Sequence, residues 1–328
     1  MSGDKQVDPG HRRRYISNHQ AWGTAKPEAP WRGGFWLGYW RGDYIAMTDL
    51  DVVRATVSSI RWFHTIDLGD GIVTAGAKPA DALRAEANAF LDPIDFTGLT
   101  VADIGAWNGY FSIDCRKRGA ARVTAVDEYT WSHPTFRGRE AIELVDRRLK
   151  ADLRFVQVDI PGTSRESIGE HDAVLLLGVY YHLFNAQTDL LRVAECARDV
   201  LIVETHQDAL AESRPAMVFY PGRTLNNDET NWWGPNPALI GSLLREAGFA
   251  RVYYKPHPSA GHGRGIFHAF RTPEAEARLA RPSLSASRRL DLDNDGSLKG
   301  TPSWVKPPPR TLRNLVRFLR GQPMTPRG

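Results

Sequence analysis

Runs of apolar residues alternate with helix-like amphipathic stretches between residue 99 and about residue 270. Four runs, LTVADI, ARVTAV, AVLLLG and VLIVET, are almost continuously apolar, as expected of strands that helices cover on both faces. The pattern predicts strands at 100–104, 122–126, 153–158, 172–177, 199–204, 249–254 and 265–270. It predicts helices at 110–118, 136–149, 187–197 and 236–247.

This alternation predicts an α/β fold with a doubly wound, seven-stranded, mostly parallel sheet. Crossovers of a dozen or more residues indicate parallel pairing, and a longer excursion precedes the last two strands. Doubly wound sheets bind ligands at the carboxyl ends of their strands. We therefore expect the functional residues to follow strands one to five.

The flanking segments differ in character from this middle part. We expect an arm and helical lid at 1–98, a ligand-binding domain at 99–272 and a basic, proline-containing tail at 273–328. Residues before about 48 are rich in Trp, Arg and Gly and predict an irregular arm whose aromatic rings pack on the body. Helices follow at 49–64 and 80–91.

The net charge of +4 is unevenly distributed. Residues 281–328 contain ten Lys or Arg and three Asp, so the tail carries +7 and residues 1–280 carry −3. The charge of the body therefore gives no support for a nucleic-acid groove. In the tail, RTLRNLVRFLR at 310–320 predicts a basic amphipathic helix, which suits a membrane surface, an acidic partner or RNA. Docking on its own domain or on a second subunit is the alternative.

Composition is that of an ordinary soluble protein, with 42% hydrophobic and 24% charged residues. No apolar run approaches the roughly 20 residues of a membrane span, and the N-terminus shows no apolar segment of a secretory signal. Cys115 and Cys196 lie in predicted helices among apolar neighbours, without metal-ligand spacing. They predict core residues in a reducing compartment, and hence a cytoplasmic protein.

The stretch VADIGAWNGYFS, 101–112, predicts a strand, a tight turn at Gly105 to Gly109, and the start of a helix. Trp107 stands where the dinucleotide pattern G-x-G-x-x-G has its second glycine, and an indole there obstructs the approach of a pyrophosphate. Asp103 at the strand end disfavours phosphate and suits an ammonium group or sugar hydroxyls. The turn therefore predicts a cofactor without phosphate.

Acidic residues also follow the second and third strands. Asp127 comes 22 residues after Gly105, the place of a carboxylate that accepts hydrogen bonds from ribose hydroxyls, although a helix cap is the alternative. Asp159 is suited to accept an adenine amino group, while Ile160 covers the ring.

Aromatic and imidazole side chains follow the fourth and fifth strands. Gly178 allows the backbone to approach a ligand, and Tyr180, Tyr181 and His182 cluster behind it. Glu204 and His206 sit at the end of the fifth strand. Further on, Asn231, Trp232 and Trp233 precede a helix; the tryptophan pair predicts a wall for a flat or sugar-like substrate, with core packing as the alternative.

In this order, VADIGAWNGYFS, RVTAVDEY, LLLGVYYHL and VETHQD resemble the motifs of class I S-adenosylmethionine-dependent methyltransferases. WFHTIDLGDGIVTAG before them and PGRTLNNDETNWWGPNPALIGSLLREAGF after them are similar to the branch that includes bacterial tRNA wobble-uridine carboxymethyltransferase. The resemblance covers roughly residues 55–270.

The resemblance implies S-adenosylmethionine as cofactor and assigns its contacts. Asp103, Gly105 and Gly109 line the methionine end, and Trp107 replaces the central glycine of the motif. The remaining implied contacts are Asp127 on the ribose, Asp159 and Ile160 on the adenine, and Gly178 and Tyr181 beside the sulfonium.

The carboxymethyl branch carries a K-G-P-F segment that holds the extra carboxylate of its donor. This chain has Asp67 and Asp70 in the corresponding region, and acidic side chains would repel such a donor. We therefore expect ordinary S-adenosylmethionine and simple methyl transfer.

A hydroxyl acceptor requires a general base, for which His206, His182 and His64 are the candidates. His206 is the first choice because the fifth strand faces the acceptor side; for His182, the alternative role is to orient Tyr181 or the donor. We expect no metal. Nothing completes a site around Glu204, His206 and Asp208, and DLDNDG at 291–296 lacks the bidentate Glu that Ca²⁺ requires.

Three functions remain open at this point. The first is methyl transfer to a hydroxyl or amine of a small molecule, a sugar or a secondary metabolite. The second is modification of the tRNA wobble uridine, with the basic tail as the RNA contact. The third is a non-catalytic scaffold in which Trp107 blocks the donor.

Overall fold

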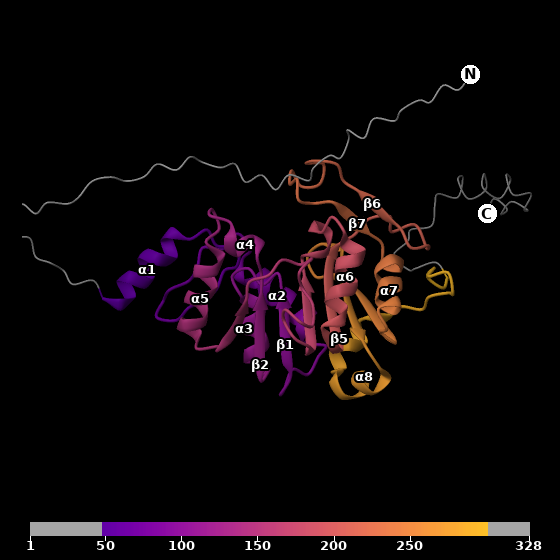
Figure 1. Cartoon of the computed structure of the whole chain (residues 1–328), viewed down its shortest axis with the longest axis horizontal. Coiled ribbons are helices and arrows are strands. Elements are labelled where there is room, and N and C mark those ends of the chain that lie inside the picture. Colours follow the sequence, from indigo (N-terminus) through magenta and orange to yellow (C-terminus); the bar gives the residue numbers. More distant parts are fainter. Residues whose placement is uncertain (1–47, 301–328) are drawn as a thin grey trace, which may run out of the picture. The chain divides into compact units, whose positions relative to one another are not determined.

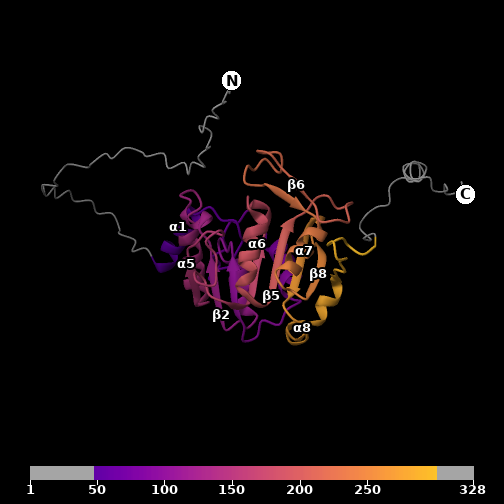
Figure 2. The same ribbon diagram turned by 45° about the vertical axis from the view of Figure 1, so that its right-hand side comes forward.

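The structure is a computed structural model that describes residues 48–300 (Figures 1 and 2). The predicted arm before residue 48 and the predicted amphipathic helix at 310–320 fall outside these residues.

A mainly parallel sheet is the centre of the fold, and its eight strands follow the order β10-β8-β9-β5-β4-β1-β2-β3. The strands are β1 (Thr100–Ile104), β2 (Arg122–Val126), β3 (Leu153–Val156), β4 (His171–Leu177), β5 (Ala197–His206), β8 (Arg251–His257), β9 (Gly261–Phe270) and β10 (Arg288–Arg289). The first five pair in parallel, whereas β9, β8 and β10 run antiparallel to their neighbours.

The predicted α/β fold is confirmed, and each predicted strand has its counterpart in the sheet. The sheet has one strand more than the seven expected, because β10 of the predicted tail pairs with β8. Two charged residues, Arg288 and Arg289, form this edge strand, so no apolar pattern marks it in the sequence.

Helices cover both faces of the sheet. They are α1 (Asp49–Ser59), α2 (Ala80–Leu91), α3 (Tyr110–Lys117), α4 (Tyr129–Ser132), α5 (Gly138–Leu149), α6 (Ala186–Glu195), α7 (Pro237–Glu246) and α8 (Pro273–Leu279), with the 3₁₀ turns η1 (Tyr180–His182) and η2 (Pro282–Ala286). The predicted helix at 49–64 ends at Ser59. The backbone after the helix forms a long-range hydrogen bond instead, in which the Phe63 N–H donates to Asn108 Oδ1 at 2.9 Å.

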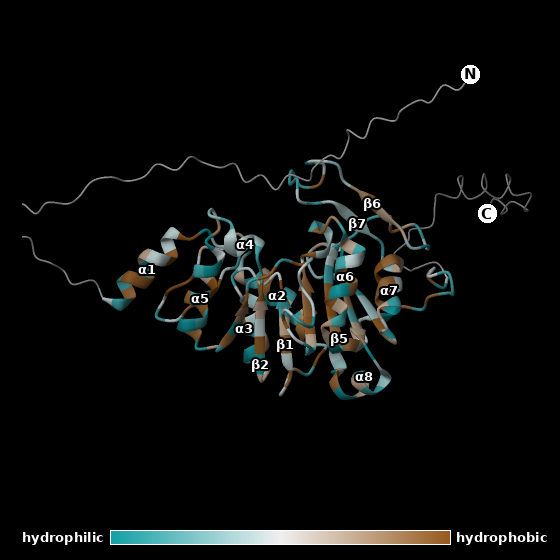
Figure 3. Ribbon diagram, in the orientation of Figure 1, coloured by the Kyte–Doolittle hydropathy of each residue, from teal (hydrophilic) through white to brown (hydrophobic). Residues whose placement is uncertain are grey.

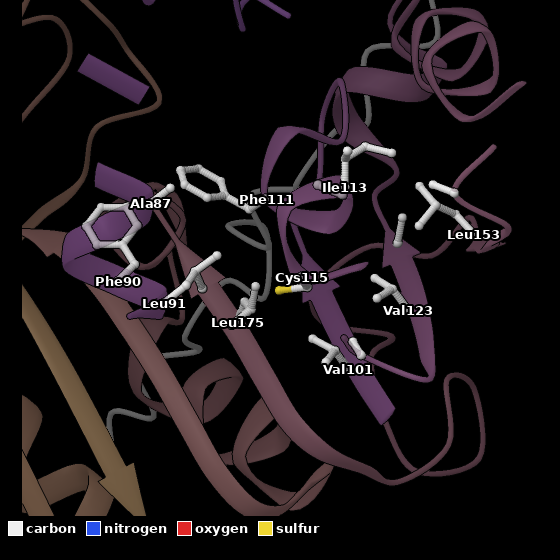
Figure 4. Packing of buried hydrophobic residues seen from close by; sticks show 14 of the residues in the cluster. Ala87, Phe90, Leu91, Val101, Phe111, Ile113, Cys115, Val123, Leu153 and Leu175 are labelled. Carbon is white, nitrogen blue, oxygen red and sulfur yellow. The ribbon is translucent and has the colours of Figure 1, made fainter. Parts of the chain in front are cut away.

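Two apolar layers form because side chains alternate across each strand. Val101, Leu175 and Ile202 face α2, α3 and α5, whereas Ala102 and Leu176 face α6 and α7. Figure 3 shows hydrophobic residues along the central strands, and Figure 4 shows the contact of the α2 and α3 side chains with the first of these faces.

A short ribbon lies in the excursion between β5 and α7. β6 (Met217–Phe219) pairs antiparallel with β7 (Trp233–Pro235) in a separate two-stranded sheet. The Trp232 N–H donates to the Tyr181 carbonyl at 2.9 Å, and the Asp208 N–H donates to the Pro235 carbonyl at 3.3 Å. The ribbon is therefore tied to the carboxyl ends of β4 and β5, where ligands bind in such sheets.

None of the helices between residues 48 and 300 combines the length and the apolar character needed to cross a bilayer.

Leu175→Ala should lower the free energy of unfolding by about 2–5 kcal/mol, because Leu175 is fully buried in the central strand β4 and its loss leaves a cavity. The matched control is Leu191→Ala on α6, where the side chain is 36% exposed and the loss should stay within about 1 kcal/mol. Urea unfolding measures both; equal losses would contradict the assignment of Leu175 to the core.

Candidate active site

The turn after β1 is held in a conformation that favours glycine. Gly105 and Gly109 both have φ of +80°, in the left-handed region. A Cβ at Gly105 would lie 2.5 Å from Val179 Cγ2, and one at Gly109 would lie 2.8 Å from Ile142 Cδ1. Both glycines are therefore required by the backbone and by packing, and the first brings the β1 turn against the exit of β4.

Trp107 adopts the glycine-like conformation of its motif position, with φ of +48°. Its N–H donates to Asp127 Oδ2 at 3.0 Å, and its carbonyl accepts from Trp131 Nε1 at 2.9 Å. The indole stacks on Phe63 with centroids 4.2 Å apart and planes 5° apart, and Phe136 meets it edge-on at 5.4 Å. The bulky ring is thus accommodated by packing on aromatic neighbours.

Unpaired polar atoms surround this turn. Within residues 48–300, Trp107 Nε1, Asn108 Nδ2 and His64 Nδ1 are buried and have no hydrogen-bond partner. An unsatisfied buried donor or acceptor costs roughly 1–3 kcal/mol. Three such groups around one turn indicate a place for a polar ligand.

Buried carboxylates complete the turn. Asp103 is 3% exposed and accepts a hydrogen bond from Ser112 Oγ at 2.5 Å; burial raises its pKa to about 6. Asp127 accepts from the Trp107 N–H and, at 3.0 Å, from the Thr130 N–H in α4, and burial raises its pKa as well. Asp127 therefore supports the first turn of α4 from the position before its N-cap, Glu128, and its contact with a ribose stays a prediction.

The residues expected at the adenine lie in the turn after β3. Asp159 is exposed, and its Oδ1 accepts from the Gly162 N–H at 2.8 Å. Ile160 is partly buried and packs against the apolar layer of α6 and α7.

An ion pair lies where β4, β5 and β9 meet. Arg264 binds Glu204 through both oxygens, at 2.6 and 2.8 Å, and Glu204 is only 3% exposed. Burial would lower the pKa of Arg264, but the hydrogen bonds and charge of Glu204 raise it, so the guanidinium stays charged. The guanidinium carbon lies 4.8 Å from the ring centroid of Tyr181. Gly178, with φ of +73°, sits beside this pair.

Two of the three candidate bases lie around Tyr181. The His182 ring is 4.1 Å from the Tyr181 ring, and its Nδ1 lies 2.9 Å from Thr230 Oγ1. The His206 ring is 6.3 Å from that of Tyr181, and its Nε2 lies 3.2 Å from Tyr220 Oη. Burial lowers the pKa of both imidazoles, which are therefore neutral near pH 7 and able to accept a proton.

His64 lies apart from these residues, against Tyr110 and Phe111 of α3. It is 5% exposed, and burial, assisted by the charge of Lys78, lowers its pKa to about 3. Such a weak base is poorly matched to proton abstraction at neutral pH, which disfavours the predicted catalytic role of His64.

An aromatic group forms on the ribbon and the adjoining loop. Phe219 stacks near Trp232 with planes 13° apart and lies 5.0 Å from Trp233, while Phe184 lies 5.2 Å from Trp232. Phe184 and Phe219 are 46% and 45% exposed. We call these four residues the aromatic wall; Phe184 and Phe219 enlarge the predicted tryptophan pair.

The other two predicted substrate contacts are inaccessible. Tyr180 is fully buried in the layer of α6 and α7, which disfavours contact with a substrate. Asn231 is 3% exposed, and its Nδ2 donates to the Leu225 carbonyl at 3.0 Å, so it supports the loop that carries Trp232.

The acidic residues expected to repel a carboxylated donor are exposed. Asp70 pairs with Arg148 at 2.5 Å, and Asp67 Oδ1 accepts from the Gly69 N–H within the same turn. Because one charge is compensated and the other faces solvent, repulsion is a weak argument for the choice of donor. Within residues 48–300, no three His, Cys, Asp or Glu side chains are grouped to hold a metal ion.

No protein-family profile matches the chain. Among solved structures, the N-terminal domain of EvdMO1 in the presence of SAH and D-fucose superposes with a TM-score of 0.53 and 18% identity, covering 71% of this chain and 100% of that one. The same domain with SAH bound superposes with a TM-score of 0.51 and 17% identity, over 70% and 98% of the two chains. The methyltransferase fold is confirmed.

Curated relatives match part of the chain. The tRNA U34 carboxymethyltransferases of Pseudomonas paraeruginosa (strain DSM 24068 / PA7) and Pseudomonas putida (strain GB-1) are 26% and 27% identical to it over 164 and 162 residues. These matches cover 48% of this chain and 47% and 48% of the relatives. The chain thus spans about half the length of the curated relatives it matches.

Two parts of the site have no counterpart among the predicted residues. Phe63 reaches Trp107 across 44 residues, a contact that no local pattern signals. Arg264 precedes the predicted strand at 265–270, but β9 begins at Gly261, and its register places Arg264 opposite His206. Side chains alternate along a strand, so extending the predicted strand back by two residues from Ile266 would have placed Arg264 on the same face as Ile266.

Gly105→Ala should destabilise the protein by about 2–4 kcal/mol, because the new methyl group meets Val179 in addition to the strain of a positive φ. Gly98→Ala is the matched control: its φ is +76° with no atom within 4 Å, so only the backbone cost of about 1–2 kcal/mol should appear. Urea unfolding compares the two, and equal costs would contradict the close contact.

His64→Leu should remove an acid sensitivity of folding. The folded pKa of His64 lies below its unfolded value of about 6.5, so the stability it permits is present above pH 6.5 and is lost as pH falls toward 3. Between pH 7 and pH 5, the wild-type protein should lose about 2 kcal/mol more than the variant. Urea unfolding at both pH values measures this, and identical losses would show that His64 titrates normally in the folded protein.

Proposed function

We propose that this protein is an S-adenosylmethionine-dependent methyltransferase that methylates a hydroxyl or amine of a small molecule, a sugar or a secondary metabolite. The observation that carries the proposal is the turn after β1, where buried carboxylates and unpaired polar atoms meet on a sheet with the methyltransferase fold. Carboxylates there disfavour phosphate and favour the ammonium group and ribose of this donor.

The residues at the turn fit the donor. Asp103 and the unpaired Nε1 of Trp107 and Nδ2 of Asn108 are suited to its methionine end. The remaining donor contacts are Gly105 and Gly109 in the turn, Asp127 at the ribose, Asp159 and Ile160 at the adenine, and Gly178 and Tyr181 beside the sulfonium. When bound, the donor supplies an activated methyl group, and the protein supplies alignment and a base. SAH in the EvdMO1 domain supports this choice of cofactor.

Methyl transfer requires the acceptor, the methyl carbon and the sulfur to lie in line. Such positioning contributes roughly 7–11 kcal/mol. The Glu204–Arg264 pair supports it by holding the ring of Tyr181 through the stacked guanidinium. His206 is the base we favour, since it ends β5 on the side where the acceptor belongs and its imidazole is neutral and partly exposed. General-base catalysis typically contributes 10²–10⁴-fold.

The aromatic wall favours a small acceptor with a flat or apolar face. Phe184, Phe219, Trp232 and Trp233 offer ring surfaces at the edge of the sheet where the acceptor belongs. The presence of D-fucose with the EvdMO1 domain is consistent with a sugar. The thiols of Cys115 and Cys196 are buried and form no disulfide, which fits the cytoplasmic location we propose.

A tRNA acceptor is the second candidate, because the curated relatives are named as tRNA U34 carboxymethyltransferases. It requires the basic residues of 281–328 to supply RNA contacts that the negative charge of residues 1–280 does not offer.

S-adenosylmethionine and SAH should each raise the melting temperature by several degrees, whereas NAD should not. A ligand at 100 times its Kd stabilises the folded state by about 2.7 kcal/mol. Differential scanning calorimetry of the full chain measures the shift, and Gly105→Ala, whose new methyl group would displace the turn from Val179, should reduce it.

A reaction with S-adenosylmethionine labelled in its methyl group then shows which kind of acceptor is methylated. Label on a sugar or other small molecule is expected; label on tRNA alone would replace the proposal with the second candidate. No shift with either sulfur nucleotide would favour the non-catalytic scaffold, with Trp107 closing the turn.

A further inference from the structure

His206 is the first member of a chain of three side chains. Its Nε2 lies 3.2 Å from Tyr220 Oη, and Tyr220 Oη donates a hydrogen bond to Asp208 Oδ2. His206 ends β5, Asp208 follows it, and Tyr220 follows β6 directly. The chain therefore connects the end of the central sheet to the ribbon that bears the aromatic wall.

The far end of this chain is fixed from several directions. Asp208 Oδ1 accepts from the Ala209 N–H at 2.6 Å, and the Tyr220 N–H donates to the Trp232 carbonyl at 2.8 Å. A Cβ at Gly234 would lie 2.8 Å from both Asp208 Cβ and Tyr220 Oη. Gly234 thus provides the space in which the tyrosine and the carboxylate meet.

The direction of these hydrogen bonds determines the tautomer of His206. Tyr220 has one hydroxyl proton, which it donates to Asp208, so its oxygen can only accept a proton from Nε2. Burial and the bond to Asp208 raise the pKa of Tyr220, which keeps the phenol protonated. His206 therefore carries its proton on Nε2, and the lone pair is on Nδ1. Within residues 48–300, no group forms a hydrogen bond with that Nδ1.

We propose that Tyr220 and Asp208 are positioning residues that hold His206 in the Nε2–H tautomer, so that Nδ1 receives the proton of the methyl acceptor. This inference rests on the proposed methyl transfer. The acceptor oxygen loses its proton to Nδ1 and bonds to the methyl carbon while the carbon–sulfur bond breaks, with its electron pair passing to sulfur. His206 becomes an imidazolium, and the negative charge of Asp208 stabilises it through Tyr220.

The charged and titratable groups that face His206 act in opposite directions. Burial and then the charge of Arg264 lower its pKa, whereas Asp208 and Glu204 raise it. The Tyr181 ring packs against it and holds no charge near neutral pH, since burial raises the pKa of that phenol too. Asp208 is thus the carboxylate in the hydrogen-bonded chain, whereas Glu204 is occupied by Arg264.

The experiment is nuclear magnetic resonance of the full chain with ¹⁵N-labelled histidine, in which chemical shifts report the tautomer of His206. Wild-type protein should show Nε2–H as the dominant neutral form. Tyr220→Phe should shift His206 to a mixture of both tautomers, because the oxygen that accepts the Nε2 proton is gone. Asp208→Asn should lower the pKa of His206, because the negative charge of Asp208 is removed.

Tyr253→Phe is the matched control, since Tyr253 Oη also donates to a carboxylate, that of Glu276, but contacts β9 away from His206. It should leave the His206 signals unchanged. A dominant Nδ1–H form in the wild type, or the same tautomer in wild type and Tyr220→Phe, would overturn the proposal. Thermal stabilisation by S-adenosylmethionine is measured on the same samples. Its absence in the wild type would overturn the proposed function separately, and its retention in Tyr220→Phe would show that the variant is folded.

Discussion

The close approach of Gly105 to Val179 is the contact on which the candidate site depends. It brings the turn after β1 against the exit of β4, two strands that are adjacent in the sheet although 66 residues separate Gly105 from His171. Because Gly105 has no side chain, the turn folds back tightly against Val179, and the Trp107 N–H meets the next carboxylate, Asp127. The same backbone path places Trp107 on Phe63 and thereby orients the segment that precedes α2.

Charge is concentrated at the carboxyl edge of an otherwise apolar sheet. Asp103, Asp127 and Glu204 are each at most 5% exposed. Only Glu204 faces an arginine; Asp103 and Asp127 are held by a hydroxyl and by backbone N–H groups, and their pKa values rise on burial. Burying carboxylates in this way reduces stability, so their retention at one edge is typical of a functional site.

The ribbon of β6 and β7 connects the aromatic wall with Tyr220, the hydrogen-bond partner of His206. Trp232 belongs to the aromatic wall, and its carbonyl and N–H hold Tyr220 and Tyr181 respectively. A displacement of the ribbon would therefore move the wall and the partner of His206 together. This coupling gives a physical reason for acceptor binding and proton removal to depend on each other in the proposed reaction.

The sequence by itself determined the α/β alternation and the turn at Gly105, because periodicity and glycine positions are local properties. It also indicated the acidic residues at the carboxyl ends of β1 and β2 and the histidine at the end of β5. Only the tertiary structure decided that Arg264 pairs with Glu204, that Tyr220 meets His206, and that Tyr180 and His64 are buried. These outcomes depend on strand register, on the antiparallel return of β9 and on contacts between residues far apart in the chain, and a single sequence carries no local signal for any of them.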